Sequence, residues 1–133
     1  MSEIPDLRPL LWIASSKRDL LKMPDDVIDD FGRWLLLVQK GKDPKNSKPL
    51  SGFGGAQILE LWRDHSDGTF RTVYTVKFAG IVVVLHAFQK KSKKGIKTDK
   101  QDIELIHSRL KLAEILYEEW KEKGGSDDQR KKI

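Results

Sequence analysis

Residues 69–88 have the sequence TFRTVYTVKFAGIVVVLHAF, and this stretch decides the fold. Both halves are rich in β-branched and aromatic residues, which favour strands, and Ala79-Gly80 between them supplies a tight turn. A third run of this kind, QILELWR at 57–63, precedes them across the turn-rich segment DHSDG at 64–68. The sequence therefore predicts three consecutive strands that pair as an antiparallel meander.

Alternation along each strand assigns side chains to opposite faces of the sheet. One face of the strand predicted over 69–78 is largely aromatic and apolar, from Phe70 to Phe78, and is the expected core face. Arg71 and Lys77 lie on the other face, and we expect them to point out from an uncovered side. The strand predicted over 81–88 is apolar on both faces, which indicates a central strand and leaves its facing open.

The segments before the meander predict a strand and two helices. Residues 10–14 (LLWIA) have the pattern of a short strand, and Ser15-Ser16 can begin a helix of about two turns. Pro24 suits the first position of a second helix, which Gly41 ends. One helix kinked at Pro24 is the alternative. Residues 42–55, rich in Gly, Pro, Lys and Ser, are expected to form a long loop.

A last helix is predicted after the meander, with Thr98 and Gln101 as a capping box and an end near Lys123. Its expected apolar face consists of Ile103, Ile106, Leu110, Leu112, Ala113, Ile115 and Leu116. The whole order predicts an α+β fold with a small, mainly antiparallel sheet, an N-terminal helical hairpin and a C-terminal helix, the helices packing on one face. The length of 133 residues fits one domain, at 1–123, followed by a polar tail at 124–133 that we expect to be disordered.

Composition excludes several classes of protein. The chain has no cysteine, which rules out disulfides and thiolate metal sites, and it contains no P-loop motif. The longest uncharged apolar stretch, 79–88, is about half of a membrane span. Glu3 and Asp6 do not fit a signal peptide. We therefore expect a globular, cytoplasmic protein without a membrane segment.

Directly after the apolar strand, residues 89–100 (QKKSKKGIKTDK) carry a net charge of +5, which equals that of the whole chain. The lysines of this segment are Lys90, Lys91, Lys93, Lys94, Lys97 and Lys100. A local positive field of this kind suits RNA phosphate. A solvated loop that keeps an edge strand soluble accounts for the charge equally well.

Two further residues are candidates for chemistry. Arg71 can clamp a phosphate with two hydrogen bonds, or it can pair with Glu60 or Asp64 across the hairpin. His86 can act as a general acid or base, or it can be a hydrogen-bonded structural residue. The remaining histidines, His65 and His107, are expected at the surface. The spacing of the three histidines predicts no metal site.

Together, Arg71, His86 and the lysines of residues 89–100 can cleave RNA without a metal or cofactor. Attack of a ribose 2′-hydroxyl needs a base, a proton donor to the leaving oxygen, and cations for the charged phosphorane. Crowded lysines have depressed pKa values and can move protons. We assign Arg71, Lys90, Lys91 and His86 to catalysis. The predicted RNA-binding residues are Phe88, which can stack on a base, together with Gln89, Lys93, Lys94, Lys97 and Lys77.

The stretch VLHAFQKKSKKGIKT, followed by KQDIELI, resembles RelE/HigB-type toxins, and more narrowly the phage-derived Gp49-like branch. FRTVY matches a strand pattern of the wider superfamily, and the similarity covers about residues 8 to 120. The resemblance implies an endoribonuclease that cleaves mRNA, typically on the ribosome, with a helix-turn-helix antitoxin as its partner. It carries Arg71 and the lysines of QKKSKK over as the basic residues. Where the wider family has a catalytic tyrosine or histidine near the C-terminus, this chain has only Tyr117, within a helix.

A different class of function stays open. The same basic segment would serve a non-catalytic RNA- or DNA-binding module, or an inactive toxin remnant that only binds its antitoxin. Phosphate binding and phosphate cleavage use the same cations, so the residues alone do not separate the two.

Overall fold

The computed structural model of the chain describes residues 7–54, 57–90 and 98–124. Its elements are β1 (Leu10–Trp12), α1 (Ser16–Leu21), α2 (Asp25–Gln39), β2 (Ser47–Pro49), β3 (Ile58–His65), β4 (Gly68–Thr75), β5 (Val82–Lys90) and α3 (Lys100–Glu122). The strands form one sheet in the order β1-β5-β4-β3-β2, with β1 parallel to β5 and all other neighbours antiparallel. The predicted α+β class, meander, helical hairpin and last helix are confirmed.

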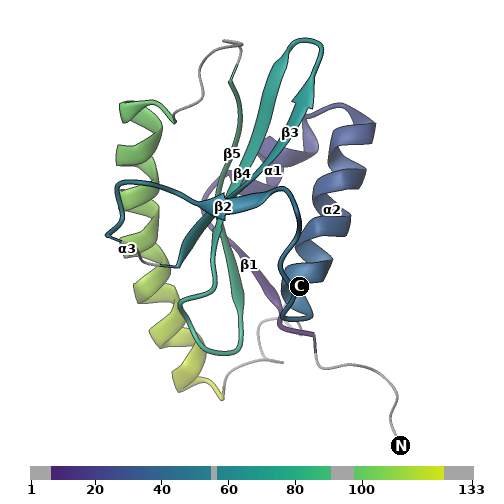
Figure 1. Cartoon of the computed structure of the whole chain (residues 1–133). Helices are drawn as coiled ribbons and strands as arrows, with labels where there is room; N and C mark the ends of the chain where they lie inside the picture. The colour runs from purple at the N-terminus through teal and green to yellow at the C-terminus, as the bar shows by residue number, and fades with distance from the viewer. Residues whose placement is uncertain (1–6, 55–56, 91–97, 125–133) are drawn as a thin grey trace, which may run out of the picture.

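Helices cover both faces of the sheet, α1 and α2 on one side and α3 on the other (Figure 1). One core packs Phe31 of α2 against Tyr74 of the sheet. The other packs Ile106 of α3 against Val73 and Val83. The prediction that the helices pack on one face is therefore wrong. The reason lies in β5, which is apolar on both faces, so that each face has to be removed from water.

A β-bulge in β5 changes which side chains face α3. Val73 pairs with His86 and Tyr74 with Val84, so Leu85 is an extra residue without a partner in β4. Val84 belongs to the core with α2, whereas His86, two residues later, contacts α3. Strict alternation would have placed these two side chains on the same face. The bulge thus re-aims His86.

Arg109 of α3 fastens the helix at this bulge. Its guanidinium donates a hydrogen bond of 2.9 Å to the carbonyl of Leu85 and one of 3.0 Å to the hydroxyl of Ser15, just before α1. Desolvation lowers the pKa of Arg109, because burial disfavours the charged form. The carbonyl of the bulged residue thus gains a partner from α3.

Several local expectations differ from the structure. The segment predicted as a long loop contains β2, which pairs with β3. Pro24 is the N-cap of α2 and not its first residue. The capping box is wrong, because Asp99 is the N-cap of α3 and Thr98 directs its hydroxyl to Glu60. Leu112 and Ile115, assigned to the apolar face of α3, are exposed, while the rest of that face packs towards the sheet.

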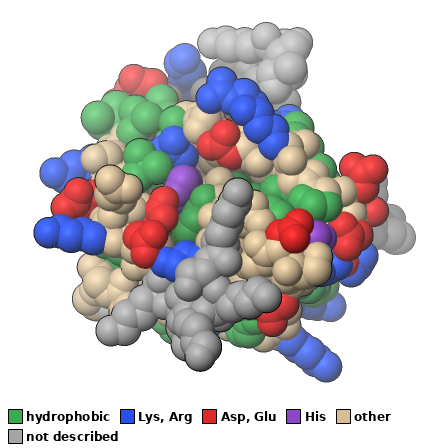
Figure 2. All heavy atoms as spheres, turned by 90° about the horizontal axis from the view of Figure 1, so that it is seen from above, with side chains coloured by type: hydrophobic (Ala, Val, Ile, Leu, Met, Phe, Trp, Pro, Cys, Tyr) green, Lys and Arg blue, Asp and Glu red, His purple; other side chains and the backbone are tan. Residues whose placement is uncertain are grey.

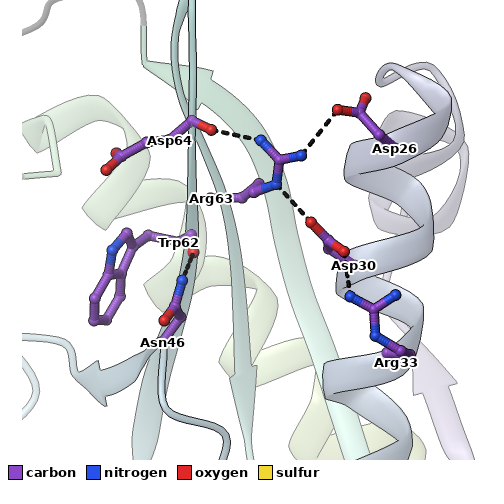
Figure 3. A network of polar contacts seen from close by, with 7 residues as sticks. All are labelled: Asp26, Asp30, Arg33, Asn46, Trp62, Arg63 and Asp64. Atoms are coloured by element: carbon purple, nitrogen blue, oxygen red, sulfur yellow. Dashed lines mark hydrogen bonds and ion pairs between the residues drawn. The ribbon is translucent and has the colours of Figure 1, made fainter.

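Arg63 ties β3 to α2 (Figure 3). Its guanidinium donates to Asp30 at 2.6 Å, to Asp26 at 2.8 Å and to the carbonyl of Asp64 at 2.6 Å. The hydrogen bond from Arg63 lowers the pKa of Asp30. Acids at the start of α2 therefore also hold the helix against the sheet.

None of the helices in the described part of the chain is both long enough and apolar enough to cross a membrane.

Candidate functional site

Four predicted site residues of the meander, Arg71, His86, Phe88 and Lys90, gather on the face of the sheet that α3 covers, towards the end where β5 stops. The pairing register places Trp62, Arg71 and Phe88 in one row across β3, β4 and β5. Glu60 and His86 occupy the next row, on either side of β4. The start of α3 lies against this end of the sheet and contributes the remaining partners.

Arg71 is buried and paired, so the expectation that it points out from an uncovered face is wrong. Arg71 is 5% exposed, and its Nη1 donates to Oε1 of Glu60 at 2.7 Å. Glu60 is 1% exposed, and its Oε2 accepts a hydrogen bond of 2.7 Å from the hydroxyl of Thr98. Because α3 covers this face, the arginine needs a carboxylate in place of water. Of the two interpretations of Arg71, the ion pair with Glu60 is the one found.

His86 is buried beside the first turn of α3. It is 6% exposed, its Nε2 lies 2.8 Å from Oδ1 of Asp102, and its ring stacks on Phe88 with the centroids 4.4 Å apart. Burial lowers the pKa of His86, Asp102 opposes this, and Arg109 and Asp19 act more weakly in opposite directions. The imidazole is therefore mainly neutral at pH 7.

The contact with Asp102 also selects the tautomer of His86. A carboxylate only accepts hydrogen bonds, so Nε2 carries the proton and Nδ1 is the basic nitrogen. Nδ1 is buried and has no hydrogen-bond partner among the described residues. His86 therefore has the proton arrangement of a base, with its basic nitrogen covered.

The end of β5 is held on two sides. Lys90 binds the carboxylate of Asp99, the N-cap of α3, and its ammonium is nearly buried. Gln89 donates its amide to the carbonyl of Asp67, in the turn between β3 and β4, at 3.1 Å. Lys90 thus lies on the same side of the sheet end as Arg71 and His86, while Gln89 turns towards the hairpin.

The other predicted site residues are not brought into this group. Lys77 follows β4 at the opposite end of the sheet, with its ammonium 3.4 Å from Glu114. Along α3, Glu114 lies about 18 Å beyond Asp102 at 1.5 Å per residue. The remaining lysines, Lys91, Lys93, Lys94 and Lys97, lie outside the described residues.

Sequence reasoning missed the partners that the start of α3 provides. Thr98, Asp99 and Asp102 bind Glu60, Lys90 and His86, respectively. An acid in the first helical turn is usually explained by the helix dipole, so nothing in the pattern sets Asp102 apart. Only the return of the chain across the end of the sheet brings these residues together.

The described residues of this group carry no positive excess. Arg71 and Lys90 each bind a carboxylate, and a third carboxylate binds the mainly neutral His86. Figure 2, which views this end of the molecule from above, shows Lys and Arg side chains interspersed with Asp and Glu. The sequence places four further lysines and no acid in residues 91–97 (KSKKGIK), which lie outside the described residues.

The lowered pKa of His86 predicts a loss of stability in mild acid. Below about pH 6.5 the unfolded chain takes up a proton that the folded chain does not, so the free energy of unfolding falls by up to about 1.4 kcal/mol per pH unit. Urea unfolding of the wild-type chain and of His86→Asn at pH 5, 6, 7 and 8 measures this. We expect the difference between the two to be constant above pH 7 and to turn against the wild type below pH 6.5. A wild-type advantage that grows in acid would show that Asp102 favours the imidazolium.

Comparison with known proteins found a matching family model and a match among solved structures. Residues 18–111 match the model of the family described as Phage derived protein Gp49-like (DUF891). Among solved structures, a chain of the toxin–antitoxin complex RelBE2 from Mycobacterium tuberculosis is similar, with 19% identity and a TM-score of 0.46. The similarity covers 68% of the present chain and 100% of that chain. The search of curated proteins gave no match.

Proposed function

Because the chain belongs to the phage-derived Gp49-like family, we propose that it is the toxin of a toxin–antitoxin system and cleaves mRNA. The matched residues include the whole meander, the lysine-rich segment and the first half of α3, where the resemblance to RelE/HigB-type toxins also lies. In this proposal the enzyme is a metal-independent endoribonuclease that acts in the cytoplasm, on translating ribosomes. A cognate helix-turn-helix antitoxin neutralises it.

The observation that carries the enzymatic part is the His86–Asp102 pair beside Arg71 and Lys90. A neutral imidazole held by a carboxylate can take the proton of a ribose 2′-hydroxyl as that oxygen attacks the adjacent phosphate. The 2′-oxygen–phosphorus bond forms, the bond to the 5′-oxygen breaks, and the leaving oxygen takes up a proton from a lysine ammonium of the site. Cations stabilise the phosphorane that develops between these steps. Residues Lys91, Lys93, Lys94 and Lys97 supply positive charge beyond the paired cations.

Three features of the site bear on how RNA has to bind. Nδ1 of His86 is covered, so a 2′-hydroxyl reaches it only when the RNA enters beside the ring. Lys90 is bound to Asp99, so a phosphate competes with this carboxylate for the ammonium. Arg71 is buried and bound to Glu60, so in this proposal it supports the site from below the surface. We expect chemistry to require substrate-induced rearrangement at the start of α3.

A second candidate function follows from the same pairing. With Arg71 and Lys90 already bound to carboxylates and Nδ1 covered, the fold also suits a toxin remnant or a module that binds RNA or DNA without cleaving it. Binding would then weaken steeply with salt, and no cleavage product would form at any salt concentration.

Induced expression in a bacterial host tests the proposal. We expect growth arrest and discrete new 5′ ends on an abundant mRNA by primer extension, both prevented by co-expression of an adjacent helix-turn-helix gene. Purified chain treated with a chelator, and then freed of it before ribosomes and message are added, should cleave as well as untreated chain. Normal growth and intact message, from soluble folded protein, would contradict the endoribonuclease and favour the binding module.

A further inference from the structure

Trp62 is the tryptophan that the two cores of the fold do not use. Of the four tryptophans in the chain, Trp12, Trp34 and Trp120 pack against one of the two described cores, whereas Trp62 belongs to neither. It is half-buried on β3, and in Figure 3 its indole points away from α2. Trp62 thus presents a large aromatic side chain on the sheet without packing in either core.

A cation lies over this indole. The ammonium of Lys48, on the neighbouring strand β2, is 5.4 Å from the centroid of the Trp62 ring. Lys48 is opposite Glu60 in the sheet, but both oxygens of Glu60 are engaged by Arg71 and Thr98. Among the described residues, no carboxylate lies within ion-pair distance of Lys48. Arg71 and Lys90 are bound to carboxylates, whereas the charge of Lys48 is available to an incoming anion.

The position of Trp62 connects it to the candidate site. Trp62 is directly opposite Arg71, which is directly opposite Phe88, so the two aromatic residues flank the arginine in one row. Their backbones are about 10 Å apart, twice the spacing of neighbouring strands. One face of Phe88 is occupied by the ring of His86, at 4.4 Å between centroids. Trp62 is thus an aromatic surface next to the site that no other ring of the described residues stacks on.

We propose that Trp62 and Lys48 form a subsite that stacks one nucleobase of single-stranded RNA and binds an adjacent phosphate. An indole face is sequence-tolerant towards bases, and an ammonium beside it matches the phosphate that follows each base. Charge favours RNA over an apolar protein segment as the occupant, because Lys48, which pairs with no carboxylate of the described residues, and the lysine-rich segment 89–100 have the same sign. The proposal rests on RNA being the substrate, and it deepens the proposed function by assigning substrate affinity to these two residues.

Binding of an uncleavable RNA tests the subsite separately from cleavage. The probe is a fluorescein-labelled single-stranded RNA octamer with 2′-O-methyl riboses, followed by fluorescence anisotropy at low salt. Trp62→Leu is expected to raise the Kd about 10- to 100-fold, whereas Trp62→Phe retains an aromatic face and most of the affinity. Lys48→Gln should weaken binding less and reduce the salt dependence by about one phosphate contact. Arg33→Gln, which removes a cation from the exposed face of α2, is the matched control and should bind as the wild type does.

Each outcome decides the subsite. Wild-type affinity in Trp62→Leu would overturn it, as would the absence of any binding by the wild-type chain. If Trp62→Leu binds RNA normally but is no longer inhibited by the antitoxin, the indole belongs to a protein interface and the proposal is wrong. If the wild-type chain binds the probe through Trp62 but does not cleave message on ribosomes, the subsite stands and the endoribonuclease fails. Unchanged melting temperatures of all variants exclude a folding effect.

Discussion

Replacement of Arg71 by methionine is expected to lower the free energy of unfolding by about 3–5 kcal/mol. The reason is Glu60, which is 1% exposed and accepts hydrogen bonds from Arg71 and Thr98. Without the guanidinium, the carboxylate has to remain buried with a single hydroxyl donor or take up a proton, and both cost free energy. Urea unfolding at pH 7, followed by circular dichroism, measures the loss.

Two further variants separate the ion pair from simple loss of a side chain. The double variant Arg71→Met with Glu60→Leu removes both charges and should recover most of the lost stability. Arg63→Met breaks ion pairs with Asp26 and Asp30 at a more exposed position, and we expect it to cost about 1 kcal/mol or less. An Arg71→Met variant within about 1 kcal/mol of the wild type would show that water reaches Glu60 in the folded chain.

Because the ion pair stabilises the fold, loss of activity in an Arg71 variant does not by itself show that the arginine binds phosphate. Arg71→Ala is the obvious variant for a phosphate-binding arginine, but its loss of growth arrest would also follow from unfolding. The comparison that separates the two is the double variant with Glu60→Leu. If that variant is folded and inactive, the cation itself is needed for cleavage.

Replacement of His86 by asparagine is expected to reduce RNA cleavage by about 10²- to 10⁴-fold, the usual contribution of a general acid or base. Asparagine can still donate a hydrogen bond to Asp102 but cannot take up a proton near neutral pH. Single-turnover cleavage on ribosomes, measured from pH 5.5 to 8.5, gives both the size of the effect and the pH dependence that disappears with the imidazole.

The matched control for His86 is another histidine of the same chain. His107 is exposed on α3 and stacks on Phe53, so His107→Asn is expected to cleave at the wild-type rate. Asp102→Asn should retain the imidazole but alter its tautomer, shifting the pH profile and lowering the rate less than His86→Asn does. Full cleavage by folded His86→Asn would remove His86 from the mechanism and leave the lysines as the proton-transfer groups.

The sequence by itself determined most of the elements and their order, but not β2, which lies in the segment predicted as a loop. β-branched alternation and Ala79-Gly80 predict the meander, Gly41 predicts the end of α2, and the end of α3 near Lys123 is as expected. These features depend on neighbouring residues along the chain, so a local pattern is sufficient to predict them. The charge of residues 89–100 is likewise a property of the sequence alone.

Only the tertiary structure decided which face each functional side chain occupies and which partner it has. One extra residue at Leu85 turns His86 towards α3, and the return of the chain places Asp102 and Thr98 against His86 and Glu60. A bulge changes the alternation of a strand without a distinctive residue, and ion pairs between distant residues depend on which helix covers which face. Burial then determined the state of the site, because it pairs Arg71 with a carboxylate and keeps His86 mainly neutral.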